Sequence, residues 1–150
     1  LQEDGRFKMN PPLRSREDRD ALIEGLRDGT IDIIATDHAP HSAEEKSRGL
    51  QGSAMGIVGL ETSFPVLYTE LVRKGVISLE KLIDLMALAP RRRFRLPLRE
   101  DDRVLIDLDT PFTIDSATFL SKGRSTPFDG REVYGRIVET IYKGKTVYKL

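Results

Sequence analysis

The chain has 150 residues with 24 basic and 24 acidic side chains, so no net charge attracts it to nucleic acid or to an anionic membrane. It has no cysteine, which excludes disulfides and thiolate metal ligands, and no apolar run long enough to span a bilayer. Since the chain has no signal-like start, we expect a cytoplasmic protein that binds neither nucleic acid nor membranes.

The amino-terminal residues predict a strand followed by a helix. Residues 7–10 have the character of a short strand, which the next two prolines would stop, because proline has no amide proton for a ladder. Ser15 is a good helix N-cap, and Gly29 lies where that helix would end. The apolar face of the helix is expected to comprise Leu22, Ile23 and Leu26.

A second strand is predicted at residues 31–35, a short β-branched run typical of a strand covered on both faces. In a βαβ unit, the right-handed crossover would place Asn10 and Asp37 at the same end of neighbouring parallel strands. Side chains at that end commonly form active sites, and both histidines of the chain, His38 and His41, follow there directly. We therefore expect the chemistry of the protein at this point.

Residues 42–59 are polar and rich in glycine, and they have no clear periodicity. They predict a long active-site loop, because loops of this length are uncommon unless they are functional or disordered. The charge run at residues 44–46 is expected to be solvated. Glu61, just beyond the loop, is interpreted as structural.

Two apolar stripes predict helices in the middle of the chain. The first helix would begin at a cap formed by Thr62 or Ser63 and end at Gly75. The second would run from a Ser78 cap until residues 89–90. Both stripes are interpreted as core and not as part of a cofactor site. Their members are Leu60, Phe64, Leu67 and Leu71 in the first helix, and Leu79, Leu82, Ile83 and Met86 in the second.

Near Arg91 the helical pattern gives way to short β-type runs, with Lys143 and Gly144 as a tight hairpin turn. This change predicts a boundary between two modules, residues 1–96 and 97–150. The predicted strands lie at residues 104–108, 112–114, 133–142 and 146–148.

Three motifs in a fixed order carry a resemblance to a known family. The central motif is TDHAPH at residues 36–41, preceded by KMNPPLR at 8–14 and followed by GIVGLET at 56–62. On these motifs the chain resembles the last third of bacterial dihydroorotases, which belong to the amidohydrolase superfamily. Weaker similarity continues through SKGR at 121–124, TPF at 126–128 and GK at 144–145.

The resemblance implies an α/β fold. Residues 1–96 would form the last βα units of a TIM-type (β/α)8 barrel, and residues 97–150 would supply strands of a small composite β-sandwich. A complete barrel typically needs about 250 residues, so the chain would be the carboxyl-terminal portion of a longer protein. The start at Leu1 also favours a fragment. We expect it to be inactive alone, because most of the metal ligands are missing, and not stably folded alone, because half of a closed sheet has unpaired edges.

The resemblance also implies roles for individual residues. Asp37 would be a metal ligand and the general acid/base that moves a proton between metal-bound hydroxide and the scissile amide nitrogen. His41 would hold the substrate carboxylate, while Asn10 and the Gly56 main chain would contact the substrate ring. From the residues alone, Asp37 as a cap, His41 as a surface histidine and Asn10 as a turn former stay open. His38 is expected to be structural or to support its neighbours.

Zinc, as one or two ions, is the cofactor that the resemblance implies. A catalytic zinc site usually needs three protein ligands, and the family's other metal histidines have no counterpart here. Most ligands are therefore expected outside this chain. The sequence also departs from the family at Ala54 and Met55, where a proline and an aromatic residue are expected, and between Arg91 and Arg103.

The implied activity is the reversible hydrolysis of L-dihydroorotate to N-carbamoyl-L-aspartate in de novo pyrimidine biosynthesis. Expected partners are this small substrate, the missing amino-terminal part of the barrel, and either a second copy or aspartate transcarbamoylase. One alternative is a non-catalytic, dihydroorotase-like scaffold for aspartate transcarbamoylase. Others are a hydantoinase or allantoinase, against which His41 argues because their substrates lack the carboxylate, and a free-standing domain unrelated to catalysis.

Overall fold

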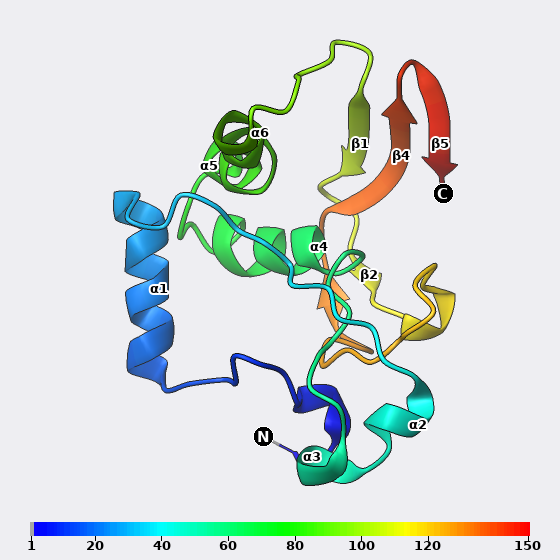
Figure 1. The fold of residues 1–150 in the computed structure, drawn as a ribbon. Helices are drawn as coiled ribbons and strands as arrows, with labels where there is room; N and C mark the ends of the chain where they lie inside the picture. The colour runs from blue at the N-terminus through cyan, green and yellow to red at the C-terminus, as the bar shows by residue number, and fades with distance from the viewer. Residues whose placement is uncertain (1) are drawn as a thin grey trace. The chain divides into compact units, whose positions relative to one another are not determined.

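The computed structural model describes residues 2–150, which form two compact units. The mixture of helices and strands agrees with the predicted α/β class (Figure 1). Each unit is assembled from separate stretches of the chain. None of the helices in this described part is long and apolar enough to cross a membrane. The first unit comprises residues 2–21, Thr36–Ser63 and Thr113–Glu132, and the second comprises Leu22–Ala35, Phe64–Phe112 and Val133–Leu150.

Short helical turns make up most of the regular structure of the first unit, which also includes the beginning of the helix Arg16–Asp28. Helix α2 (Ala43–Lys46) begins with a capping box, in which the Ser42 hydroxyl accepts from the Glu45 N–H while the Glu45 carboxylate accepts from the Ser42 N–H. The predicted loop at residues 42–59 therefore contains regular structure that its composition does not indicate. The remaining turns are helix α3 (Gly49–Gly52) and the 3-10 helices Gly5–Phe7 and Ser116–Thr118.

The strands predicted at residues 7–10 and 31–35 are wrong. Neither segment joins a ladder in the described part of the chain, because its backbone groups pair with turns and helices instead. Ile34, for example, donates its N–H to the carbonyl of Leu85 in a helix at 3.0 Å. An extended apolar run becomes a strand only when another strand lies beside it, so the predicted βαβ unit is absent from these residues.

Helix α1 (Arg16–Asp28) confirms the predicted helix and its cap. The Ser15 hydroxyl accepts from the Asp18 N–H at 3.2 Å, and the Asp18 carboxylate accepts from the Ser15 N–H at 3.1 Å. The predicted apolar face is wrong at Leu22, which is 58% exposed. The buried position of this helix is Gly25, whose missing side chain allows a close approach that Leu22 does not make.

Two long helical stretches form the core of the second unit. Helix α5 (Leu79–Ile83) starts at the predicted cap, where the Ser78 hydroxyl accepts from the Lys81 N–H at 3.1 Å. Pro90 does not end this stretch as predicted. Just before α6 (Ala89–Phe94), the backbone widens into a π-helical segment, Asp84–Leu88. Such a segment accommodates Pro90, which has no backbone N–H to donate to the preceding turn. The first stretch consists of α4 (Ser63–Leu67) and the π-helical segment Tyr68–Val72.

The predicted core is confirmed at Leu82 and Leu71, which are buried. It is wrong at Leu60, which is 65% exposed and precedes helix α4, and at Ile83, which is 39% exposed. Leu85, which the predicted stripe omits, is only 1% exposed. Leu85 lies in the π-helical segment, where the side chains depart from a regular 3.6-residue pattern, whereas Leu60 and Ile83 precede the π-helical segments.

The carboxyl-terminal strands confirm the predicted β-region. Strand β4 (Arg136–Tyr142) pairs antiparallel with β1 (Arg103–Asp107) on one side and with β5 (Lys145–Lys149) on the other. Lys143 and Gly144 both have positive φ, 51° and 71°, as a tight type I′ hairpin turn requires. A separate two-stranded sheet consists of β2 (Phe112–Thr113) and β3 (Glu132–Val133).

Candidate active site

A cavity of about 370 Å³ in the first unit brings together three of the four predicted site residues. Asn10, Asp37 and Gly56 all line it, although the strands that were expected to carry the first two are absent. Met9, Met55 and Ile57 add apolar lining. The cavity therefore combines an amide, a carboxylate and main-chain groups with an apolar wall, a composition typical of small-molecule sites.

Asp37 has a left-handed backbone with φ of 45°, which aspartate tolerates better than most residues. Its side chain is exposed, and no hydrogen bond or ion pair occupies the carboxylate among the described residues. Both oxygens are thus available to a ligand. The cap predicted as the alternative role of Asp37 is not formed in this structure.

His38 connects three distant segments of the first unit. Its Nδ1 accepts from the N–H groups of Gly59 at 3.1 Å and Leu60 at 3.3 Å, and its Nε2 lies 3.4 Å from the Ser121 hydroxyl. A ring nitrogen that accepts carries no proton, so in the neutral ring Nε2 holds the proton and donates to Ser121. Both nitrogens are thus used within the chain, as a structural role requires.

His41 is the predicted site residue that does not line the cavity. Its Nε2 donates to the Met55 carbonyl at 2.9 Å, and its Nδ1 lies 3.7 Å from the Glu45 carboxylate. A Cβ on Gly56 would lie 3.0 Å from His41 Nε2, so the ring is packed directly behind the cavity wall. Its predicted role toward a substrate carboxylate stays a prediction.

Two glycines allow the central motif to pack closely against other segments. Gly56 has a φ of 141°, and a Cβ there would lie 2.7 Å from the Cβ of Ala39. At Gly123 a Cβ would lie 2.6 Å from the Cβ of Pro40 and 2.8 Å from the His41 amide nitrogen. No other residue fits either position without moving its neighbours. Of the Gly56 main-chain groups, the N–H already donates to the Lys8 carbonyl at 3.1 Å.

Glu61 joins two of the sequence motifs, in agreement with its predicted structural role. Its carboxylate accepts from the N–H groups of Leu120 at 3.0 Å and Ser121 at 3.1 Å. Together with the His38 contacts, these bonds bring the motifs at residues 36–41, 56–62 and 121–124 to one place. The motifs are thus neighbours in space as well as ordered in sequence.

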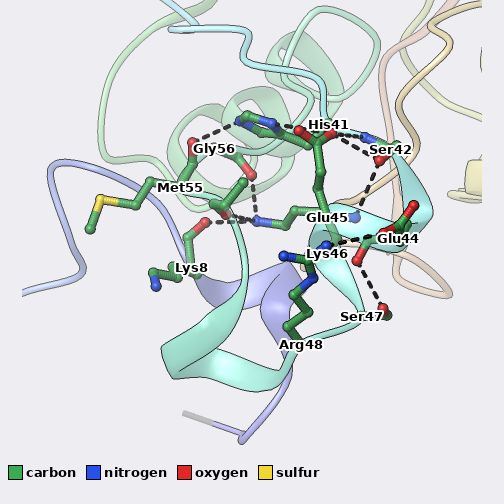
Figure 2. Close-up of polar contacts among 11 residues, drawn as sticks. Lys8, His41, Ser42, Glu44, Glu45, Lys46, Ser47, Arg48, Met55 and Gly56 are labelled. Carbon is green, nitrogen blue, oxygen red and sulfur yellow. Dashed lines mark hydrogen bonds and ion pairs between the residues drawn. The ribbon is translucent and has the colours of Figure 1, made fainter.

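Lys46 was not identified from the sequence, and the prediction that its charge run is solvated is wrong for this residue. Its side chain is only 7% exposed, and its ammonium group donates to the carbonyls of Lys8, Ala54 and Gly56 at 3.0, 2.8 and 2.7 Å (Figure 2). Burial, and secondarily the nearby charge of Lys8, lower the pKa of Lys46 below its usual value. A charge run carries no local signal that one member points inward.

Metal binding by these residues alone depends on Asp37. Among residues 2–150 there is no group of three or more histidine, cysteine, aspartate or glutamate side chains that could hold a metal ion. Asp37 offers two free carboxylate oxygens, which zinc accepts as ligands. The role of Asp37 as a metal ligand stays a prediction.

A larger cavity, of about 490 Å³, lies in the second unit and contains none of the predicted site residues. Its charged lining includes Asp84 and Arg92, which form a two-pronged ion pair at 2.8 and 2.9 Å. These groups neutralise each other, and the cavity has no feature of the expected chemistry.

Solved structures of cyclic-amide hydrolases share this fold. L-hydantoinase from Arthrobacter aurescens matches with a TM-score of 0.86 and 35% identity over 95% of this chain and 34% of its own. D-hydantoinase from Bacillus sp. AR9 matches with a TM-score of 0.85 and 25% identity over 97% of this chain and 34% of its own. The chain thus shares its fold with hydantoinases, the class of cyclic-amide hydrolase that these two structures represent.

Within that class, the sequence is similar to bacterial dihydroorotases over nearly its whole length. The dihydroorotase of Shouchella clausii is 54% identical over 98% of this chain, and that of Listeria innocua is 55% identical over 97%. The chain spans 36% and 35% of these two relatives. No family model matches the chain. The resemblance predicted from the motifs is confirmed, and the sequence fits a carboxyl-terminal portion of a bacterial dihydroorotase.

Proposed function

We propose that this chain supplies the Asp37 part of a dihydroorotase active site, within a longer protein that reversibly hydrolyses L-dihydroorotate to N-carbamoyl-L-aspartate. The observation that carries the proposal is the cavity lined by Asn10, Asp37 and Gly56. The higher identity to dihydroorotases, 54% against 35% for the L-hydantoinase, favours dihydroorotate over a hydantoin as substrate.

Asp37 has the central role in this proposal. Its carboxylate would ligate zinc and also accept a proton and pass it to the scissile amide nitrogen. Zinc, when bound, would lower the pKa of a water molecule and polarise the amide carbonyl. Since a catalytic zinc site usually needs three protein ligands, the other ligands would come from residues outside this chain.

The neighbours of Asp37 would hold the substrate ring. Asn10 carries one acceptor and two donor positions, which suit the alternating carbonyl and N–H groups of a pyrimidine-like ring. The Gly56 backbone would lie against the same ring, and His41 would hold the carboxylate if its bond to the Met55 carbonyl is released.

The proposal extends to the architecture of the longer protein. Residues 1–96 would complete a TIM-type barrel, and residues 97–150 would join a composite β-sandwich. The unpaired segments at 7–10 and 31–35 would then find neighbouring strands in the amino-terminal part of the barrel. Pairing of this kind supports the expectation that the isolated chain is inactive.

The test uses the longer protein that carries this chain, with dihydroorotate hydrolysis as the assay. Replacing Asp37 by Asn keeps the shape of the side chain but removes its charge, so we expect kcat to fall by about 10²–10⁴-fold, the usual contribution of a general acid/base. Bound zinc should fall as well, measured by elemental analysis.

Asp32→Asn is the matched control, because Asp32 is an exposed carboxylate on the same segment that does not line the cavity. It should leave kcat and zinc content unchanged. Full activity in Asp37→Asn would overturn the proposal. A wild-type protein that is metal-free, inactive and bound to aspartate transcarbamoylase would support the scaffold alternative instead.

A further inference from the structure

The buried Lys46 ammonium group forms no ion pair with a carboxylate among residues 2–150. Its three N–H bonds are directed at three backbone carbonyls, those of Lys8, Ala54 and Gly56 (Figure 2). An ammonium group has three donors and no acceptor, so these three bonds satisfy it completely. Burying a charge in this way is costly, and a simple surface lysine on a four-residue helix would avoid the cost.

The three carbonyls belong to the two segments that line the cavity beside Asp37. Lys8 lies two residues before Asn10, and Ala54 and Gly56 belong to the segment that carries Met55 and Ile57. One ammonium group therefore bonds to both segments. These segments share no strand ladder or disulfide in the described part of the chain, so few bonds set their separation.

Two further hydrogen bonds involve the Lys8 carbonyl and the carbonyl that lies between Ala54 and Gly56. The Lys8 carbonyl, which accepts from Lys46, also accepts from the Gly56 N–H at 3.1 Å. The Met55 carbonyl, between the two carbonyls that Lys46 binds, accepts from His41 Nε2 at 2.9 Å. Three successive carbonyls, 54 to 56, thus accept from the Lys46 ammonium group or the His41 ring.

We infer that Lys46 is a positioning residue for the reaction: its ammonium group fixes the Asn10 segment against the Gly56 segment and so sets the shape of the substrate cavity beside Asp37. The inference rests on the proposed function, which makes that cavity the substrate site. Lys46 touches neither substrate nor metal in this assignment. It would act on substrate binding and not on the proton transfer that Asp37 performs.

The first test is Lys46→Met in the longer protein that carries this chain. Methionine has a similar length but no donor, so it removes all three bonds from Lys46 to the carbonyls. We expect the KM for dihydroorotate to rise about tenfold or more, while kcat changes by less than about threefold, the pattern expected when ground-state and transition-state binding are lost equally. Zinc content should be unchanged.

Lys8→Met is the matched control, because the Lys8 side chain donates only to the Gln51 carbonyl while its own carbonyl stays in place for Lys46. Its KM should be close to wild type. Lys46→Arg is the second variant. Arginine keeps the charge, but its planar donors cannot meet three carbonyls around one nitrogen, so its KM should rise to an intermediate value.

A second measurement separates this inference from the proposed function. Hydrogen exchange at the Gly56 amide, which donates to Lys8, should accelerate in Lys46→Met and not in Lys8→Met. If the wild-type protein does not hydrolyse dihydroorotate, the proposed function fails, and the exchange result still decides whether Lys46 fixes the two segments. An unchanged KM together with unchanged exchange in Lys46→Met would overturn the inference, as would an equal loss in both lysine variants.

Discussion

The first unit holds its segments together with single polar contacts and close glycine packing, whereas the second unit uses helices and strand ladders. Around the cavity of the first unit, His38, Glu61 and Lys46 together join residues from five separate stretches of sequence. In the second unit, β4 lies between two antiparallel neighbours, and Leu82 and Leu85 are enclosed by helices.

This difference shows that a site can be held in place without regular secondary structure. A ladder distributes its stability over many similar bonds, so losing one bond changes little. Where one side chain such as Lys46 holds separate segments together, all of these bonds depend on that single residue. Substitutions in the second unit should therefore act mainly on stability, and substitutions in the first mainly on function.

The largest effect on stability is expected from Leu82→Ala, because Leu82 is fully buried. Removing its side chain should lower the free energy of unfolding by about 2–5 kcal/mol, the usual cost of a leucine-sized cavity in a core. Urea unfolding of the longer protein measures this change. Ile83→Ala, at the exposed neighbouring position, should cost far less, and the KM of the folded fraction should stay the same in both.

Gly123→Ala, by contrast, should affect function more than stability. The added Cβ would lie within 3 Å of Pro40 Cβ and of both the N and O atoms of His41, and backbone atoms cannot move aside as a flexible side chain can. We expect the free energy of unfolding to fall by about 1–3 kcal/mol, which is typical of overpacking. Converted to free energy, the loss in kcat/KM for dihydroorotate should be larger than this.

Gly52→Ala is the control for this change, since its new Cβ would meet only the Arg48 side chain. Comparing kcat/KM and unfolding midpoints for the two variants separates the effect on the site from the general effect of replacing glycine. Equal effects of both substitutions on kcat/KM would contradict the comparison between the units.

The smallest effect concerns the Glu45 carboxylate in the capping box of α2. Hydrogen bonds from the Ser42 backbone and hydroxyl lower the pKa of Glu45 below its usual 4.5. Because the folded-state pKa is depressed, its contribution to stability is present above about pH 4.5 and disappears as pH falls through the lowered pKa. Hydrogen exchange in α2 should therefore accelerate on acidification.

Glu45→Gln should weaken that acid dependence, since glutamine can still bond to Ser42 but does not titrate. Glu44→Gln, which alters a carboxylate paired with Arg48 at the surface, serves as its control. An unchanged pH profile in Glu45→Gln would show that the capping box does not control the local stability.

Local signals account for the parts of the fold that the sequence predicts correctly. The caps at Ser15 and Ser78 and the hairpin at Lys143 and Gly144 depend on residues within a few positions of each other. The strand at 31–35 fails because a strand requires a neighbour that no local pattern supplies. For the same reason, the inward direction of Lys46 depends on carbonyls up to 38 positions away.

Local motifs and long-range packing also contribute differently to the predicted site residues. The central motif identifies Asp37 and leads to Asn10 and Gly56, and the cavity does contain all three. The motif gives no indication that His41 is bonded to the Met55 carbonyl, because that bond depends on how the later segment folds back. Residue identity thus predicted which groups gather, and long-range packing determined which of them face the cavity.

The bond between His38 and Ser121 also has a consequence for synthesis of the protein. The two residues are 83 positions apart, so at about 5–20 residues per second a ribosome adds Ser121 about 4–17 s after His38. During that interval the Asp37 segment is without the partners that later enclose it, and Gly123 arrives only two residues after Ser121. The nascent chain therefore carries the Asp37 carboxylate well before the residues that complete its surroundings.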